Sequence, residues 1–205
     1  VYPSTDKAIE PPSLYGATKR LAEAMLRAAA ATGGPRSTIV RFVNVLGSQG
    51  SAPETFARQV RAGRPLTITH PEMRRYWITP QHANLLLLHG ACFGGSGERS
   101  ITVAPDAGDE IASVEIARRV AQAISPGAPE PPITVTGLRP GERLAEPLTA
   151  SHERLERLNL PGLLAVRGIP PVDPAAVVSA VRRVVTLLDQ DPSPTQLRAA
   201  LLSAF

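Results

Sequence analysis

The stretch that decides the fold is Tyr15-Gly16-Ala17-Thr18-Lys19, which follows Ser4-Thr5-Asp6-Lys7. Strong helix formers continue as far as Leu26, so the sequence predicts a helix here. Tyr15 and Lys19 are four residues apart, and such a pair lies on one face of a helix, one turn apart. A phenol beside an ammonium group is suited to act as a general base on a hydroxyl group that gives up a hydride.

The distribution of lysine supports a chemical role for this region. Among the 22 Lys and Arg residues only Lys7 and Lys19 are lysines, and both lie in the opening segment. Arginine stays charged in proteins, whereas a lysine amine can lose its proton and act as a base. Both lysines are therefore candidate catalytic residues.

The same residues carry a resemblance to a known family. Ser4–Ala8, Pro11 and Tyr15–Glu23 resemble the extended short-chain dehydrogenase/reductases, and the most similar group is the capsule and polysaccharide-biosynthesis type of UDP-N-acetylglucosamine 4,6-dehydratase. The resemblance continues through three further blocks in family order: Arg41–Ser51, Thr67–Met73 and Gly137–Leu144. It covers roughly the first 150 residues.

This resemblance implies an α/β fold, the C-terminal part of a Rossmann-like enzyme with a partial parallel sheet and flanking helices. No Gly-x-Gly-x-x-Gly turn occurs in the sequence, so we expect the N-terminal cofactor-binding half to be absent. We expect three regions: 1–65 as the end of the catalytic domain, 66–150 as a small substrate-binding region interleaved with the last sheet strands, and 151–205 as a C-terminal helical extension.

Local patterns predict the individual elements. Residues 1–12 read as the end of a strand and a loop from which Asp6 and Lys7 can leave the sheet, because three prolines disfavour a helix there. We expect a turn at 94–97, and Ser113 as the cap of its helix. The helices are expected at about 14–31, 53–62, 80–92, 113–124, 151–158, 174–189 and from 194 onward, and the strands at 37–45, 66–69, 100–103 and 133–136.

The resemblance assigns roles to five catalytic residues. In such enzymes a hydride leaves C4 of the sugar for NADP, water is lost across C5 and C6, and the hydride returns to C6. Tyr15 would be the base at the 4-hydroxyl, and Lys19 would hold the nicotinamide ribose. Asp6 would be the acid at C6 and Lys7 the base at C5, while Thr5 would hydrogen-bond the sugar near C4. The cofactor expected is NADP or NAD, with most of its site missing from this chain.

The resemblance also assigns the UDP-amino-sugar substrate. Asn44 and the loop with Ser48, Gly50 and Ser51 would hold the sugar diphosphate, since glycines permit close backbone approach. The remaining substrate-binding candidates are Thr67 and Thr69 for the uracil, Arg75 and Arg139 for the phosphates, and Glu142 for the ribose hydroxyls.

Composition limits the other possibilities. The net charge of +4 is spread along the chain, which favours an anionic small molecule over nucleic acid. The single cysteine, Cys92, and the absence of a long apolar run predict a cytoplasmic chain without a membrane segment of its own, although relatives are often membrane-anchored. The histidines show no metal signature. The complete enzyme is expected to be a homo-oligomer.

Two other functions stay open. An epimerase or reductase of nucleotide-diphospho-sugars with the same fold would keep Tyr15 and Lys19 but would have no use for an acid–base pair at Asp6 and Lys7. A truncated, non-catalytic fragment that binds a nucleotide-sugar is the non-enzymatic alternative. A 4,6-dehydratase of surface polysaccharide biosynthesis is the function that the sequence favours.

Overall fold

The computed structural model describes residues 1–92 and 97–205; the turn expected at 94–97 lies outside them except for Gly97. The chain forms two compact units that are interleaved along the sequence. Unit 1 comprises Val1–Phe42, Leu85–Asp106 and Pro147–Phe205, and unit 2 comprises Val43–Asn84 and Ala107–Glu146. The three functional regions expected at 1–65, 66–150 and 151–205 stay a prediction.

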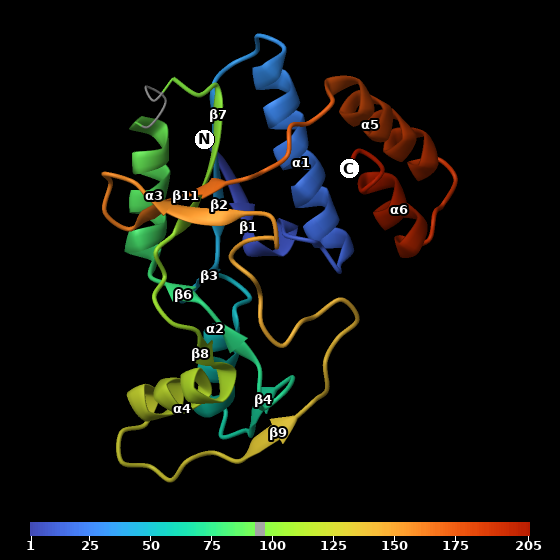
Figure 1. The fold of residues 1–205 in the computed structure, drawn as a ribbon. Coiled ribbons are helices and arrows are strands. Elements are labelled where there is room, and N and C mark those ends of the chain that lie inside the picture. Colours follow the sequence, from blue (N-terminus) through green and yellow to red (C-terminus); the bar gives the residue numbers. More distant parts are fainter. Residues whose placement is uncertain (93–96) are drawn as a thin grey trace. The chain divides into compact units, whose positions relative to one another are not determined.

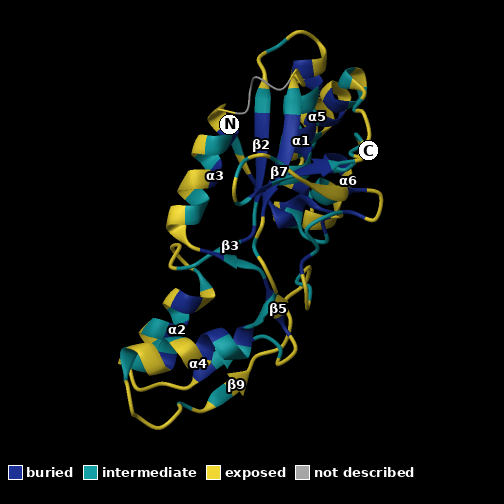
Figure 2. Cartoon of the chain, turned by 60° about the vertical axis from the view of Figure 1, so that its left-hand side comes forward, coloured by how far each residue is buried: buried dark blue, intermediate teal, exposed yellow. Residues whose placement is uncertain are grey.

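Unit 1 is built on a five-stranded sheet in the order β1-β2-β7-β11-β10 (Figure 1). The strands β1 (Tyr2–Thr5), β2 (Ser37–Phe42) and β7 (Ser100–Pro105) are parallel, while β11 (Leu163–Arg167) and β10 (Arg154–Arg157) complete the sheet antiparallel. The buried colour along β2 and β7 in Figure 2 agrees with their apolar, β-branched sequences, which are typical of strands covered on both faces.

Helices cover both faces of this sheet. Thr38 and Val40 of β2 contact Gly90 in α3 (Pro80–Cys92), whereas the alternate residue Arg41 binds Glu23 of α1 (Leu14–Ala31) (Figure 1). The helices α5 (Pro174–Leu188) and α6 (Pro194–Leu201) then pack on α1 through a small apolar cluster. Its buried members are Ala17, Leu21, Ala24, Ala28, Val177, Ala180 and Leu201.

Three helices begin at residues whose side chains cap them. The side chain of Ser13 accepts a hydrogen bond from the backbone N–H of Gly16 and starts α1 as predicted, and Asp173 and Ser193 cap α5 and α6 in the same way. The prediction for Ser113 was wrong. The cap of α4 (Ser113–Ile124) is Ala112, whose side chain cannot accept a hydrogen bond, and Ser113 already belongs to the helix.

The helix predicted at 151–158 was also wrong. Arg154–Arg157 form β10, an exposed edge strand that pairs antiparallel with β11. The sequence His152-Glu153-Arg154-Leu155-Glu156-Arg157 has mixed charges and few apolar residues, so it carries no alternation that would reveal a strand. Only pairing with β11 decides its conformation.

Unit 2 is a small α/β unit. The helices α2 (Ala52–Arg61) and α4 pack around Phe56, Leu66 and Ile116. Three two-stranded pairs complete the unit: β3 (Asn44–Val45) with β6 (Trp77–Ile78), β4 (Leu66–Ile68) with β9 (Ile133–Val135), and β5 (Arg74–Arg75) with β8 (Ile111–Ala112). The first two pairs are parallel and the third is antiparallel.

Neither membrane nor metal features were found in the part of the chain that the structure describes. No helix over residues 1–92 and 97–205 has both the length and the apolar character needed to cross a bilayer. Within the same residues, no three His, Cys, Asp or Glu side chains are grouped so that they could hold a metal ion.

Candidate active site

The end of β1 places the predicted acid–base pair outside the sheet. The strand stops at Thr5, and a 3₁₀ turn, η1 (Asp6–Ala8), begins at the next residue. The Thr5 hydroxyl donates a hydrogen bond to Asp6 Oδ1 at 2.9 Å, and Lys7 Nζ donates to the same oxygen at 2.9 Å. The hydroxyl oxygen also accepts from the backbone N–H of Lys7 at 3.4 Å. Thr5, Asp6 and Lys7 therefore form one hydrogen-bonded cluster.

The two charged members of this cluster differ in exposure. The Asp6 side chain is 2% exposed, whereas the Lys7 side chain is 32% exposed and can be reached from solvent. Asp6 Oδ2 is buried and has no hydrogen-bond partner in the described residues. A buried carboxyl oxygen without a partner is costly, and the role of Asp6 as an acid stays a prediction.

A close approach at Gly16 brings this cluster to the start of α1. A Cβ atom on Gly16 would lie 2.1 Å from the Lys7 carbonyl oxygen and 2.8 Å from Pro11 Cβ, distances that real atoms do not adopt. The missing side chain thus lets the backbone of η1 contact the helical turn that carries Tyr15. The structure therefore brings together the two sequence blocks from which the catalytic residues were predicted.

Tyr15 and Lys19 lie in successive turns of α1, as predicted. The Tyr15 side chain is exposed, at 54% for the residue. Lys19 Nζ donates to the Pro3 carbonyl at 3.2 Å and lies 5.1 Å from the centre of the Tyr2 ring. An ammonium group has three N–H donors, so Lys19 retains donors for a ligand. An exposed phenol and a cation with spare donors fit a nicotinamide ribose.

Unit 2 contains a pocket of about 510 Å³ at the N-terminal end of α2. Five of the residues predicted to bind substrate line it: Gly50, Thr67, Thr69, Arg139 and Glu142. The lining residues that the prediction missed include Phe56, Met73, Ser113 and Thr136. Met73 had a signal because it ends the block Thr67–Met73 that resembles the family, and Phe56 had one as an apolar residue one turn into a helix that follows a glycine-containing loop.

Local contacts hold the polar residues of the pocket in place. Gln59 of α2 donates to the Thr67 hydroxyl at 2.7 Å and accepts from the Thr67 backbone N–H at 3.1 Å. Glu142 accepts from the Arg139 backbone N–H at 3.0 Å and lies 3.5 Å from the Thr69 hydroxyl. The Arg139 side chain itself is exposed. The pocket thus has a buried apolar wall and a polar rim with one accessible guanidinium.

Other predicted substrate-binding residues do not line this pocket. Asn44 Nδ2 donates to the Tyr76 carbonyl at 3.3 Å, and the Ser48 hydroxyl donates to the Val45 carbonyl at 2.9 Å. The Ser51 hydroxyl is buried without a partner in the described residues, although Ser51 precedes α2 at its N-cap. Their roles as ligands of the sugar diphosphate stay predictions.

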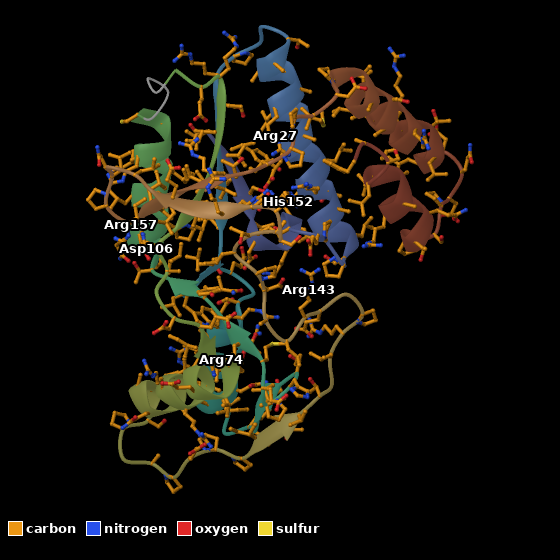
Figure 3. All side chains as sticks on the ribbon, viewed as in Figure 1. Arg27, Arg74, Asp106, Arg143, His152 and Arg157 are labelled. Atoms are coloured by element: carbon orange, nitrogen blue, oxygen red, sulfur yellow. The ribbon has the colours of Figure 1, made fainter. Side chains whose placement is uncertain are left out.

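Arg75 is engaged within the protein. Its guanidinium donates to the carbonyls of Arg74, Leu144 and Arg143 at 2.7, 2.8 and 2.7 Å, and it lies 3.8 Å from a Glu146 carboxyl oxygen. The neighbouring Arg74, labelled with Arg143 in Figure 3, donates to the Glu110 carbonyl at 2.7 Å. The contacts of Arg75 fix the chain segment that follows the Arg139–Glu142 turn, so its part in phosphate binding stays a prediction.

Comparison with known proteins places these features in a family. The sequence profile described as "Polysaccharide biosynthesis protein" matches residues 1–167. The chain is 37% identical over 151 residues to the capsular polysaccharide biosynthesis protein CapD of Staphylococcus aureus. It is 38% identical over 151 residues to the probable polysaccharide biosynthesis protein EpsC of Bacillus subtilis. A UDP-glucose 4-epimerase of Rickettsia massiliae is 31% identical over 153 residues. Each match covers 73% of this chain.

Solved structures give the same fold. The X-ray structure of Pen from Bacillus thuringiensis superposes with a TM-score of 0.71 and 26% identity, over 82% of this chain and 51% of that one. MoeE5 in complex with UDP-glucuronic acid and NAD superposes with a TM-score of 0.58 and 20% identity, over 70% of this chain and 52% of that one.

The matches leave much of the relatives uncovered. The chain spans 25% of the length of CapD and of EpsC and 43% of the Rickettsia epimerase. Within that span the motifs, the mixed α/β fold and the profile match agree. The chain belongs to the polysaccharide biosynthesis protein family of the extended short-chain dehydrogenase/reductases.

Proposed function

We propose that the chain supplies the acid–base residues and the nucleotide pocket of an NADP- or NAD-dependent 4,6-dehydratase of a UDP-amino sugar, such as UDP-N-acetylglucosamine. The observation that carries this proposal is the cluster of Thr5, Asp6 and Lys7. A buried carboxyl group and a reachable amine, 2.9 Å apart, are the two groups that the loss of water from a sugar requires. An epimerase has no step that uses them.

A single proton transfer within the pair would prepare it for this task. Transfer of one proton from Lys7 Nζ to Asp6 Oδ1 would convert the ion pair into a carboxylic acid and a free amine without changing the total charge. The amine can then take the C5 proton, while the acid protonates the 6-hydroxyl so that it leaves as water. Thr5 stays hydrogen-bonded to Asp6 and orients it.

Tyr15 and Lys19 serve the oxidation at C4. In our proposal Tyr15 takes the proton of the 4-hydroxyl, and Lys19 binds hydroxyl groups of the nicotinamide ribose with its spare donors. The chemistry that a bound nicotinamide cofactor would supply is the removal of a hydride from C4 and its return at C6. The NAD complex of the structural neighbour MoeE5 supports a nicotinamide cofactor of this type.

The pocket of unit 2 suits the nucleotide. Phe56 and Met73 offer apolar surface to a base, the Thr67 and Thr69 segment offers backbone and hydroxyl groups, and Arg139 offers a forked cation to a phosphate. In our proposal Glu142, which lines the same pocket, binds the ribose hydroxyls. The UDP-glucuronic acid bound by MoeE5 supports the assignment of a UDP-sugar.

A fusion tests the reaction. The cofactor-binding part of CapD, the S. aureus relative, is joined upstream of Val1, and the fusion is incubated with UDP-N-acetylglucosamine in D₂O with NADP or NAD. We expect mass spectrometry to detect loss of water together with deuterium at C5. Asp6→Asn and Lys7→Ala should each abolish the loss of water, whereas Ser37→Ala, a change elsewhere in the sheet, should leave it intact.

The epimerase alternative gives a different result. It is favoured by the similarity to the Rickettsia UDP-glucose 4-epimerase. In that case the fusion inverts C4 without losing water, and both Asp6→Asn and Lys7→Ala retain most of the activity. This outcome would reject the dehydratase.

A further inference from the structure

Three residues that repeat along α1 link the candidate catalytic residues to the protein interior. Tyr15, Lys19 and Glu23 follow one another at four-residue intervals, so they lie along one face of the helix. Tyr15 is exposed, whereas Glu23 is 0% exposed. The contacts of Glu23 therefore fix the rotation of the helix and, with it, the direction in which Tyr15 and Lys19 point.

The same carboxylate contacts the strand that leads to Asp6. Ser4 Oγ donates a hydrogen bond to Glu23 Oε1 at 2.6 Å, a short contact typical of a charged acceptor. Ser4 is the residue before Thr5, and its backbone neighbour across the parallel pair is Arg41. Lys19 adds a second link from α1 to β1 through the Pro3 carbonyl. Glu23 thus touches both segments that carry the candidate catalytic residues.

Arg41 holds Glu23 in a single orientation. Its Nε and Nη2 donate to Glu23 at 3.1 and 2.9 Å, and its Nη1 donates to Glu153 Oε2 at 2.7 Å. Glu153 in turn accepts from the Ala150 backbone N–H at 2.9 Å. Burial lowers the pKa of the Arg41 guanidinium, but the charges and hydrogen bonds of the two carboxylates outweigh it and raise the pKa above its usual value. Arg41 thus stays charged.

Two further arginines of α1 interact electrostatically with this buried network. Arg20 and Arg27, the latter labelled in Figure 3, extend from the same helix. Burial lowers the pKa of both guanidinium groups, to about 10 for Arg27. At neutral pH Arg27 is still charged, and it offsets the excess negative charge of two carboxylates that share one arginine. The network therefore holds α1, β2 and the segment around Glu153 in one arrangement.

We infer that Glu23 is a positioning residue that sets the register between α1, with Tyr15 and Lys19, and the β1–η1 junction, with Asp6 and Lys7. It acts through Ser4 on the strand and through Arg41 on the sheet. The position of α1 relative to the β1–η1 junction is a property of the chain alone. Its importance for catalysis rests on the proposed function. Gly16 supports the same register from the other end, because its lack of a side chain lets η1 lie against α1.

The test uses the two lysines as reporters. With ¹³Cε- and ¹⁵Nζ-labelled lysine, the chain gives side-chain NMR signals from Lys7 and Lys19 alone. Ser4→Ala removes the hydroxyl that contacts Glu23 and leaves Arg41 with both carboxylates. The matched control is Ser37→Ala, which removes a hydroxyl of the same sheet that donates to Ser100 Oγ at 2.9 Å.

We expect Ser4→Ala to move the Lys7 signal while the far-ultraviolet circular dichroism of the chain stays unchanged, and Ser37→Ala to move neither signal. A Lys7 signal that shifts no more in Ser4→Ala than in Ser37→Ala would overturn the inference. Glu23→Gln should move the signals of both lysines, because the neutral amide binds Arg41 less tightly. If that variant does not fold, Ser4→Ala alone decides the question.

The fusion with the S. aureus relative adds a kinetic readout. Ser4→Ala should lower kcat about ten- to a hundredfold, as expected for a small displacement of reacting groups, and should leave KM unchanged, because Ser4 is not proposed to contact substrate. An unchanged kcat in an active fusion contradicts the inference. A wild-type fusion without activity instead contradicts the proposed function, and the lysine signals still decide the role of Glu23.

Discussion

Replacing Arg41 by methionine tests the buried network most directly. Arg41, Glu23 and Glu153 have side chains that are 1%, 0% and 0% exposed. Methionine fills much of the space but leaves two carboxylates buried without their cation. Removing one partner of a buried ion pair costs about 3–5 kcal/mol, a large share of the roughly 5–15 kcal/mol that stabilises a typical folded protein. We expect unit 1 to lose stability by about that amount.

An exposed network in the same sheet provides the matched control. Arg167 also joins two carboxylates, Glu98 at 2.5 Å and Glu156 at 3.3 Å, but these carboxylates are 45% and 49% exposed. Water can solvate them when the arginine is removed. Arg167→Met should therefore cost only about 0–1 kcal/mol. The comparison separates the effect of burial from the effect of losing an arginine between two acids.

The assay must measure the unfolding of unit 1. Trp77 is the only tryptophan and lies in unit 2, so its fluorescence follows the other unit. Urea-dependent hydrogen exchange, measured by mass spectrometry on peptides of α1 and β2, follows the affected elements. A triple variant, Glu23→Gln with Arg41→Met and Glu153→Gln, should regain part of the lost stability because no buried carboxylate is left without Arg41. The reasoning is refuted if Arg41→Met costs no more than Arg167→Met.

Two other predictions concern acid and nucleotide. Burial tends to raise the pKa of Glu153, but the hydrogen bonds and charge of Arg41 outweigh it and hold the pKa below its ordinary value of 4.5. The stability that this shift contributes is therefore complete above pH 4.5 and is lost as the pH falls through the lowered pKa. The free energy of unfolding of unit 1, measured with urea between neutral pH and pH 3, should therefore fall less steeply in Glu153→Gln than in the wild type. An equally steep fall would contradict this prediction. By calorimetry the chain alone should bind UDP weakly and NADP negligibly. Arg139→Ala should weaken UDP binding about tenfold, as expected for one charge-assisted contact, and the exposed Arg61→Ala outside the pocket should not; equal effects of the two variants would exclude Arg139 as a ligand.

The sequence determined the parts of this protein that depend on neighbouring residues. Ser13, Asp173 and Ser193 start their helices because a cap acts on backbone groups two or three residues away. The four-residue interval between Tyr15 and Lys19 likewise placed both side chains on one helix face before any fold was known. The prolines around Asp6 favoured a segment that leaves the sheet, as it does after Thr5, but the segment forms a 3₁₀ helix where a loop was expected.

Tertiary structure decided what depends on residues distant in the sequence. The conformation of Arg154–Arg157 came from pairing with β11, because its own charged sequence favours no strand. Arg75 donates to the Leu144 carbonyl, and Arg41 pairs with Glu23 and Glu153. These contacts join chain segments that meet only on folding. A charged side chain in a sequence does not show whether its partner is water, a ligand or another buried charge. That choice is made by the packing that removes the water.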